Sequence, residues 1–303
     1  MITMDPRPDW QSWCAGLNGQ TTVTGVFGWP VKHSLSPPMH NAAFAALGLN
    51  WAYIPFPVRP EELGTAIAGV RALGMRGVNV TIPHKGAVIE FLDELDQTAA
   101  TLQAANTIDI CEGKLTGYNT DGPGFIASLR EIGWVAAGRA VTMIGAGGSA
   151  RSVAAAVLRE GAERLSIINR TPAKAEALAK LLTTGQAAEI ATAGLDGAQA
   201  EEWVRAAEIV IDCTSVGMYP HVDVAPVVPA EWLHQGQLVC DLTYNPRHTV
   251  LLEAAQQRGA ETLDGTGMLV HQGAIAFAQW TGQAAPVEVM RQALLNALQQ
   301  RPA

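Results

Sequence analysis

The chain has no excess of basic residues and no hydrophobic run long enough to cross a membrane. Its 303 residues include 20 Lys and Arg against 28 Asp and Glu, a formal net charge of −8. A nucleic acid or an anionic membrane would require a basic face on the protein, so we expect neither as a partner. A membrane-spanning helix needs about 20 apolar residues, and no stretch approaches that length. Any anionic ligand must therefore be held by a few well-placed cations.

Cysteines and metal-binding motifs are scarce as well. The seven histidines include no HExxH pattern and no Cys/His ligand spacing, so the sequence predicts no metal site. The first residues lack the basic and apolar regions of a secretion signal, which predicts a cytoplasmic protein. Reduced thiols fit that compartment, and two of the four cysteines lie in apolar, strand-like runs. The four are widely spaced: Cys14, Cys111, Cys213 and Cys240.

Apolar, β-rich runs alternate with helical patterns along the chain, an order typical of a mostly parallel sheet covered by helices. The sequence therefore predicts an α/β fold, and its length favours two domains. One helix is predicted to begin at Pro172, with an apolar stripe through residue 182, and another spans residues 287–298. The predicted strands are residues 22–28, 51–58, 75–82, 140–145, 164–170, 208–214 and 237–244.

Residues 107–122 interrupt this alternation. Their sequence, TIDICEGKLTGYNTDG, alternates around a Glu-Gly pair, which predicts a hairpin with a turn glycine. The hairpin would deliver residues 119–121 to the end of an element, just before GPGF, where glycine and proline predict a loop. We place the first domain boundary there, after residue 124. This loop and the later LDGTG segment (263–267) are expected to permit hinge motion.

The clearest motif is a glycine-rich turn between a predicted strand and an alanine-rich helix, RAVTMIGAGGSARSVAAAVLRE (139–160). Its Gly145-x-Gly147-x-x-Ala150 pattern lets backbone N–H groups approach a diphosphate at a helix N-terminus. A second strand follows at the spacing that a βαβ unit requires. A GxGxxA pattern alone is weak evidence, and a tight turn without a ligand remains the alternative.

The end of that second strand distinguishes between two dinucleotides. A site for NAD typically has Asp or Glu there, which accepts a hydrogen bond from the ribose 2′-OH. This chain has Asn169-Arg170-Thr171 instead, with Lys174 shortly after. Arg170 and Lys174 could pair with a 2′-phosphate, although solvated charges at the start of a surface helix are the alternative. The sequence favours NADP.

Two serines precede a predicted helix in GWPVKHSLSPPMHNAAFAALG (28–48). Ser34 and Ser36 lie on a turn, and prolines open the helix. Two hydroxyls at this spacing near a helix N-terminus can donate hydrogen bonds to one carboxylate. The same pattern is also common in helix capping, which stays open as the alternative.

NVTIPHKG (79–86) ends a strand-like run with a cation, Lys85, for which a solvated loop lysine is the ordinary interpretation. Its neighbour His84 would point to the opposite face of an extended chain, which favours a packing or surface role. Further polar residues fall at the ends of predicted strands or turns, where open α/β sheets form their ligand crevice. They are Asn79, Thr81, Asn106 and Asp121.

Together these motifs resemble the shikimate dehydrogenase family over most of the chain. The resemblance implies a substrate domain (1–124) completed by C-terminal helices (266–303), a Rossmann NADP-binding domain (125–265), and a cleft between them. The motifs occur in the order of the family: GWPVKHSLSP, NVTIPHK, AANT, NTDG, GAGGSAR, NRT, TSVGM, DLTYNP and DGTGMLVHQG.

The resemblance also implies a role for each matching residue. Lys85 would be the catalytic lysine, paired with Asp121 at the substrate oxygen that changes oxidation state. Substrate-binding residues would be Ser34, Ser36, Thr81 and Tyr244 at the carboxylate, and Asn79, Asn106, Asp121 and Gln272 at the ring hydroxyls. Cofactor-binding residues would be Gly145, Ala146, Gly147, Gly148 and Ser149 at the diphosphate, Asn169, Arg170, Thr171 and Lys174 at the ribose phosphate, and Leu242 and Gly265 near the nicotinamide.

The implied reaction is the reversible, NADPH-dependent reduction of 3-dehydroshikimate to shikimate, with a homodimer left open. Two alternatives remain: a sibling oxidoreductase acting on quinate or an amino analogue, perhaps with NAD, and a ligand sensor without turnover. Ser36 in place of a bulkier threonine opposes the first, and intact Lys85 and Asp121 oppose the second. Trp29 and Pro123 depart from the usual family pattern, but neither replaces a reacting group.

Overall fold

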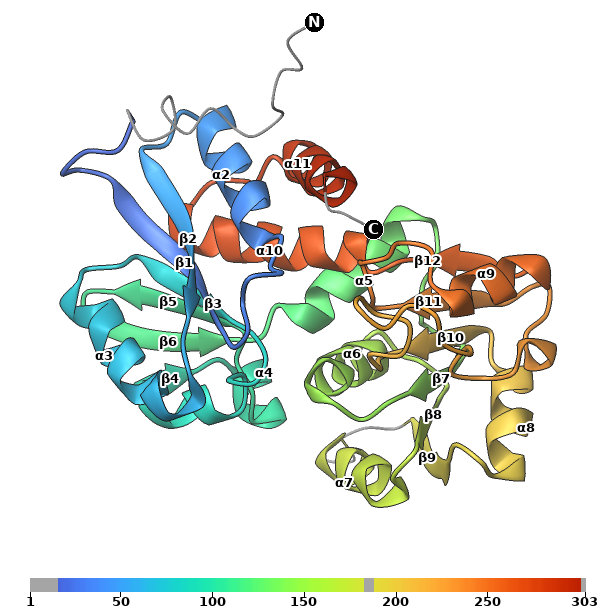
Figure 1. The fold of residues 1–303 in the computed structure, drawn as a ribbon. Coiled ribbons are helices and arrows are strands. Elements are labelled where there is room, and N and C mark those ends of the chain that lie inside the picture. The colour runs from blue at the N-terminus through green and yellow to red at the C-terminus, as the bar shows by residue number, and fades with distance from the viewer. Residues whose placement is uncertain (1–15, 183–187, 301–303) are drawn as a thin grey trace, which may run out of the picture.

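The computed structural model describes residues 16–182 and 188–300, which form two six-stranded sheets (Figure 1). Cys14 lies outside the described residues. The first sheet uses strands between residues 22 and 118, and the second uses strands between residues 140 and 263. The predicted α/β fold is therefore confirmed. No helix in the described part of the chain is both long and apolar enough to cross a membrane.

The first sheet is mixed, with the strand order β2-β1-β3-β5-β6-β4. β1 lies between β2 and β3 and is parallel to both, whereas β5 and β6 form the predicted hairpin, whose turn residues Glu112 and Gly113 both have positive φ. The strands are β1 (Thr22–Gly28), β2 (Trp51–Pro57), β3 (Gly77–Val80), β4 (Glu94–Leu95), β5 (Thr107–Cys111) and β6 (Lys114–Tyr118).

Helices bury both faces of this sheet. On one face, aromatic side chains of α2 and α10 meet β1 and β2, and α11 adds Met290 and Leu294. On the other face, α3 packs against β3 and β5. The C-terminal helices thus contact the strands formed by the N-terminal part of the chain. These helices are α2 (Ser36–Ala46), α3 (Leu63–Ala72), α4 (Gln97–Leu102), α10 (Thr266–Thr281) and α11 (Val287–Gln299), with short 3₁₀ turns at Pro60–Glu62 and Ala87–Phe91.

The second sheet is parallel throughout, with the order β12-β11-β10-β7-β8-β9. This is the Rossmann order, in which the direction of winding reverses between β7 and β10. The strands are β7 (Ala140–Ile144), β8 (Arg164–Asn169), β9 (Glu189–Gly194), β10 (Ile209–Asp212), β11 (Leu238–Asp241) and β12 (Glu261–Leu263). Its helices are α5 (Asp121–Glu131), α6 (Gly148–Arg159), α7 (Pro172–Leu182), α8 (Ala198–Ala206) and α9 (Val250–Gln257), with a 3₁₀ turn at Ala230–Trp232.

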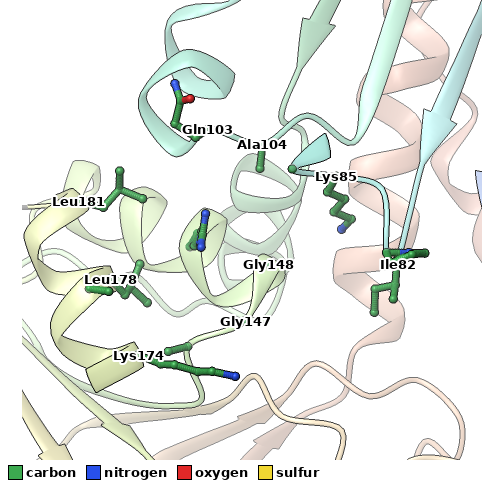
Figure 2. Close-up of a pocket in the computed structure, with 14 residues that line it drawn as sticks. Ile82, Lys85, Gln103, Ala104, Gly147, Gly148, Lys174, Leu178 and Leu181 are labelled. Carbon is green, nitrogen blue, oxygen red and sulfur yellow. The ribbon is translucent and has the colours of Figure 1, made fainter. Parts of the chain in front are cut away.

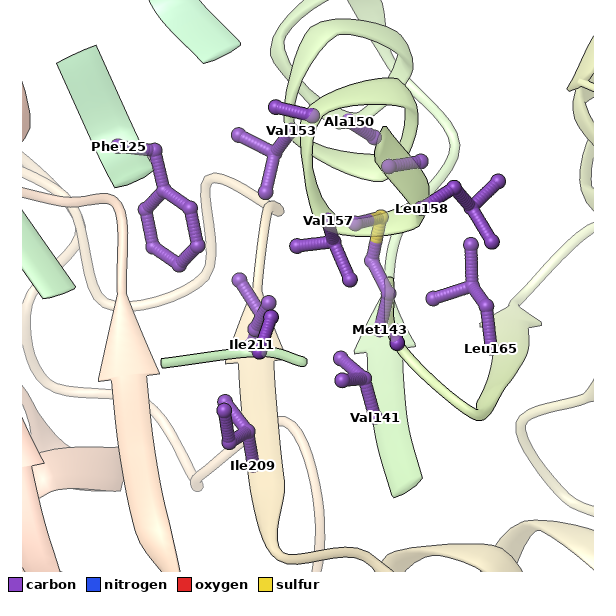
Figure 3. Packing of buried hydrophobic residues seen from close by; sticks show 14 of the residues in the cluster. Phe125, Val141, Met143, Ala150, Val153, Val157, Leu158, Leu165, Ile209 and Ile211 are labelled. Carbon is purple, nitrogen blue, oxygen red and sulfur yellow. The ribbon is translucent and has the colours of Figure 1, made fainter. Parts of the chain in front are cut away.

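The alanine-rich helix α6 packs closely on the centre of this sheet. Val153 and Val157 face Val141, Met143 and Ile211 in a fully buried cluster (Figure 3). Small alanines on the same helix allow close contact with the neighbouring elements. Each buried valine stabilises the fold, because removing apolar surface from water contributes about 25 cal/mol per Å². This packing fixes the N-terminus of α6, and with it the glycine turn that precedes it.

Helix α5 connects the two lobes and corrects one prediction. GPGF was expected to be a loop, but it forms the first turn of α5, which begins at Asp121. Proline is tolerated there because the first turn of a helix has no intrahelical partner for its N–H groups. A side chain at Gly124 would collide with Gln272 of α10, so glycine allows the two helices to approach closely. GPGF, the first of the two segments predicted to permit hinge motion, is therefore helical and tightly packed.

The predicted strands are confirmed, most of them shorter by one to four residues than expected. Lys85 does not end a strand as predicted, because β3 stops at Val80 and Lys85 follows in a turn. Three strands were missed: β4, β9 and β12. Two of these are only two or three residues long, and β9 contains no run of β-branched residues, so local pattern did not distinguish them from loops. The helices predicted at Pro172 and at residues 287–298 are confirmed as α7 and α11.

Two buried carboxylates lie side by side at the C-terminal ends of β10 and β11. Asp212 is paired in register with Asp241. Asp212 Oδ1 accepts a hydrogen bond from the Thr214 backbone at 2.7 Å, but its Oδ2 has no partner among the described residues. Burial, and then the neighbouring charge of Asp241, raise the pKa of Asp212 to about 7. The protonated form of Asp212 is therefore favoured in the folded protein below about pH 7.

This gives a prediction for stability against pH. Between about pH 4 and pH 7 the folded state binds a proton that the unfolded state has lost, so stability must fall as pH rises. From pH 5 to pH 8, the free energy of unfolding of the wild type should fall by about 2 kcal/mol more than that of Asp212→Asn. Denaturant unfolding at the two pH values measures this difference. The exposed Asp223→Asn serves as the control and should keep the wild-type slope. Identical slopes for wild type and Asp212→Asn would contradict the assignment.

Candidate active site

An ion pair between Lys85 and Asp121 lies at the boundary of the two lobes. Lys85 Nζ is 2.5 Å from Asp121 Oδ2, and the two side chains are only 16% and 7% exposed. The Lys85 turn is held to the first sheet because its carbonyl accepts a hydrogen bond from Ala105 N at 2.9 Å. Asp121 is the first residue of α5, where the helix dipole favours a carboxylate. Backbone structure therefore holds both members of the ion pair in place.

Asn106 orients the other oxygen of Asp121. Its Nδ2 donates to Asp121 Oδ1 at 2.8 Å and to Thr120 Oγ1 at 3.0 Å. Its Oδ1 accepts from Thr120 N at 2.8 Å, which fixes the direction of the amide. Gln272 Oε1 of α10 lies 3.4 Å from the same Nδ2. Both oxygens of the Asp121 carboxylate are therefore engaged, one by Lys85 and one by Asn106.

A second group of predicted residues is connected to this pair through buried hydrogen bonds. Asn79 Nδ2 donates to Thr107 Oγ1 at 3.0 Å, and Thr107 Oγ1 in turn lies 3.3 Å from Asn106 Oδ1. On its other side, Asn79 Oδ1 accepts from Tyr53 OH at 2.6 Å. A continuous polar network thus runs from Tyr53 on β2 to Lys85.

The remaining predicted substrate residues lie around this network. Ser34 Oγ accepts from Ser36 N at 3.3 Å, at the start of α2. Thr81 is half-buried, and its backbone N–H donates to Phe27 O at 2.9 Å at the end of β1. Tyr244 is half-buried against the cluster formed by α2 and α10. His84 is buried, and its Nε2 lies 2.8 Å from Val58 O, which confirms its structural role.

A cavity of about 620 Å³ opens between the lobes and joins Lys85 to the glycine turn. Figure 2 shows Lys85 entering this space from the first lobe, opposite Gly147, Gly148 and Lys174 of the second. The first lobe contributes Ile82, Pro83, Lys85, Gly86, Gln103 and Ala104, and the second contributes Ala146, Gly147, Gly148, Arg151, Lys174, Ala177, Leu178 and Leu181. Lys85 is the predicted substrate residue that lines this cavity, and the predicted cofactor residues that line it are Ala146, Gly147, Gly148 and Lys174.

The glycine turn has the properties of a binding site for a dinucleotide. Gly147 and Gly148 are exposed, and a Cβ at either position would meet no atom within 4 Å. The packing of the protein itself therefore does not require glycine there, whereas close approach of a diphosphate does. The first turn of α6 has no side-chain cap, which leaves its N–H groups available to an anion. Arg151 and Lys174 bring exposed positive charge to the same cavity.

Other predicted cofactor residues do not line the cavity. Asn169 ends β8 and donates to Thr171 O at 2.8 Å, while Arg170 and Thr171 are exposed. Ser149 lies in the first turn of α6. Leu242 and Gly265 are adjacent, because a Cβ on Gly265 would lie 2.1 Å from Leu242 O. No group of three potential metal-ligating side chains occurs in the described ranges.

Sequence analysis did not identify three polar residues of this site: Tyr53, Thr107 and Thr120. All three are buried. Tyr53 lies in the middle of a predicted strand and looked like an ordinary core residue. Thr107 and Thr120 flank Asn106 and Asp121, so proximity to a predicted site residue was the only available signal. The apolar lining residues Ile82 and Pro83 stood in a quoted motif but received no role.

Three family models match consecutive parts of the chain. The shikimate dehydrogenase substrate-binding domain matches residues 26–108. The shikimate/quinate 5-dehydrogenase model matches residues 129–249. The shikimate 5′-dehydrogenase C-terminal domain matches residues 265–295. Together the three models cover both lobes and the returning helices.

Relatives and solved structures match over nearly the whole chain. A shikimate dehydrogenase (NADP(+)) from Methanopyrus kandleri is 48% identical over 93% of this chain and 98% of its own length. A crystal structure of a shikimate dehydrogenase in complex with NADP+ has a TM-score of 0.86 and 45% identity, covering 93% of this chain and 97% of the other. A quinate dehydrogenase from Corynebacterium glutamicum, solved with NAD, has a TM-score of 0.84 and 32% identity, covering 91% of this chain and 99% of the other.

The glycine turn yields a paired prediction. Gly147→Ala should leave the melting temperature unchanged, because its Cβ would enter open space, but should weaken NADP+ binding, because a methyl group would meet the diphosphate. Gly145→Ala should lower the melting temperature, because Gly145 has φ +102° and its Cβ would crowd Thr214 and Cys213. Thermal melts with and without NADP+ measure both effects. Unchanged NADP+ affinity in Gly147→Ala would oppose a dinucleotide at this turn.

Proposed function

Because the chain belongs to the shikimate dehydrogenase family, we propose that it catalyses the reversible, NADPH-dependent reduction of 3-dehydroshikimate to shikimate. One observation carries the proposal: Lys85, paired with Asp121 at 2.5 Å, opens onto the same cavity as Gly147 and Gly148. A proton donor and a dinucleotide-binding turn facing one cleft are the two elements that a carbonyl reduction requires. The reaction belongs to the shikimate pathway of aromatic amino-acid biosynthesis.

In the proposed mechanism, Lys85 supplies the proton. When bound, NADPH supplies the hydride to the carbonyl carbon of the substrate. The Lys85 ammonium donates a hydrogen bond to the carbonyl oxygen, stabilises the negative charge that develops there, and transfers its proton to give the hydroxyl. Asp121 holds the ammonium in position. Lys85 then regains a proton from water, and in the reverse direction it accepts the hydroxyl proton.

The substrate would lie along the polar network of the first lobe. Its carboxylate would accept hydrogen bonds from Ser34 and Ser36 at the N-terminus of α2, with Thr81 and Tyr244 nearby. Amides and the carboxylate of the network would bind the ring hydroxyls, because the amides offer oriented donors and acceptors and the carboxylate offers oriented acceptors. These residues are Asn79, Asn106, Asp121 and Gln272.

NADP would lie along the second lobe. Backbone N–H groups of residues 145–149 would bind its diphosphate, and the positive charge of Arg170 and Lys174 would pair with the 2′-phosphate, beside Asn169 and Thr171. Leu242 and Gly265 would lie near the nicotinamide. We also propose the division of the chain into a substrate domain (1–124 with 266–303) and a cofactor domain (125–265), whose first boundary falls within α5, and a cytoplasmic location.

Replacing Lys85 tests the proposed acid. Lys85→Ala should lower kcat by roughly 10²–10⁴-fold, because general acid catalysis contributes about that factor, and should change KM for shikimate far less. Lys114→Ala is the control, since Lys114 pairs with Glu94 at the exposed surface. Steady-state kinetics in both directions measure these parameters. If Lys85→Ala instead raised KM for shikimate and left kcat intact, Lys85 would bind the substrate without taking part in proton transfer.

The substrate and cofactor need a test of their own. Purified protein should reduce NADP+ fastest with shikimate when shikimate and quinate are each assayed with NADP+ and with NAD+. A preference for quinate or for NAD+ would favour the sibling oxidoreductase. Absence of reduction in all four combinations would favour a ligand sensor and refute the proposed enzyme.

A further inference from the structure

Arg151 is a cation of the second lobe to which the proposed function gives no role. It is the fourth residue of α6, its side chain is exposed, and it lines the cavity between the lobes. Away from Lys85, that cavity extends between Gln103 of the first lobe and Leu181 of α7 (Figure 2). It therefore receives a guanidinium from α6 in addition to the ammonium of Lys174 from α7.

Neither cation has a counterion in the part of the chain that the structure describes. Within residues 16–182 and 188–300, the side chains of Arg151 and Lys174 form no hydrogen bond and no ion pair. Arg130 shows the contrasting arrangement, because its guanidinium donates to both oxygens of Glu160 at 2.7 Å. The first turns of α6 and α7 also contain no acidic residue, although the net charge of the chain is −8. Positive charge is thus concentrated at one place in an acidic protein.

The positions of the two cations in their helices add to this positive charge. Partial positive charge from backbone N–H groups accumulates at a helix N-terminus, so a cation in the first turn is electrostatically unfavourable. Lys174 is the third residue of α7. Arg151 is one place further along α6, and helical side chains tilt toward the N-terminus of their helix. An anion bound in the cavity would remove this repulsion.

NADP has two anionic groups, and the fold favours one of them as the partner of Arg151. The diphosphate binds to backbone N–H groups of the glycine turn, at the start of α6. The 2′-phosphate belongs to the adenosine ribose, which Rossmann folds place at the C-terminal end of the second strand, here β8. Because α7 begins at Pro172, shortly after β8 ends at Asn169, Lys174 would lie close to that ribose. Arg151 lines the same cavity as Lys174, whereas Arg170 does not line it.

We infer that Arg151 is a specificity-determining residue that pairs with the 2′-phosphate of NADP together with Lys174. This inference rests on the proposed function, in which the second lobe binds NADP. A phosphate monoester carries a charge of about −1.5 to −2 at pH 7, which two cations balance. The planar guanidinium of Arg151 can donate two parallel hydrogen bonds to the phosphate oxygens, while Lys174 acts as a point charge. NAD has a hydroxyl at this position, so the selection of NADP would come from α6 as well as from the segment that follows β8.

Arg151→Gln tests the inference, because it removes the charge and keeps an exposed polar side chain. Isothermal titration calorimetry should show that 2′,5′-ADP binds roughly 10- to 100-fold more weakly than to the wild type, the loss expected for hydrogen bonds to a charged group. The affinity for 5′-AMP, which lacks the 2′-phosphate, should change by less than about twofold. Arg151→Lys should recover part of the loss, since it restores the charge without the planar fork. Lys180→Gln is the control, because Lys180 is exposed on α7 and does not line the cavity.

The outcomes separate this inference from the proposed function. Wild-type protein that fails to oxidise shikimate with NADP+ refutes the proposed function, whereas the calorimetric comparison requires no turnover. In active protein, Arg151→Gln should raise KM for NADP+ and leave KM for NAD+ unchanged. An unchanged affinity of Arg151→Gln for 2′,5′-ADP overturns the inference. An equal loss for both nucleotides would place Arg151 at the 5′-phosphate, and an equal loss in Lys180→Gln would reflect overall charge, so either result overturns it as well.

Discussion

The site depends on one partly buried ion pair, that between Lys85 and Asp121. Removing an ammonium and a carboxylate from water costs several kcal/mol per ion unless further hydrogen bonds satisfy them. Asp121 obtains these from Asn106 and from its place at the N-terminus of α5, and Asn106 is held in turn by the backbone of Thr120. Lys85 keeps some exposure toward the cleft. The protein therefore fixes the direction of the ammonium and still leaves it accessible to a reacting oxygen.

Helix α5 relates this ion pair to the cofactor lobe. The helix begins at Asp121, packs on α6 through Gly122, which lies against Ser152, and crosses α10 through Gly124. Because α6 carries the glycine turn and α10 carries Gln272, the same helix sets the distance from the ion pair to both halves of the site. Motion of one lobe against the other must preserve or bend this helix, which argues for small closures around a rigid connection rather than for a free hinge at GPGF.

The predictions that succeeded rest on local rules, and those that failed depended on tertiary context. The hairpin at Glu112-Gly113 and the glycine turn at Gly145 follow from positive φ and alternation, which short segments specify by themselves. GPGF was assigned wrongly because proline and glycine also fit the first turn of a helix. Tyr53 and Asn79 are 26 residues apart and meet only through the register of three parallel strands, which no local pattern specifies. The roles of Lys85 and Gln272 came from family resemblance, since spacing alone left Lys85 indistinguishable from a solvated loop lysine.

The central claim is geometric: an ammonium from the first lobe and a dinucleotide on the second meet at one substrate oxygen. A crystal structure of the protein with both shikimate and NADP+ tests it most directly. The account predicts Lys85 Nζ within about 3.2 Å of the hydroxyl oxygen that is oxidised, the shikimate carboxylate at Ser34 and Ser36, and the nicotinamide on the opposite face of the ring. A complex in which Lys85 points into solvent, or in which shikimate lies outside the cleft between Lys85 and Gly147, would contradict it.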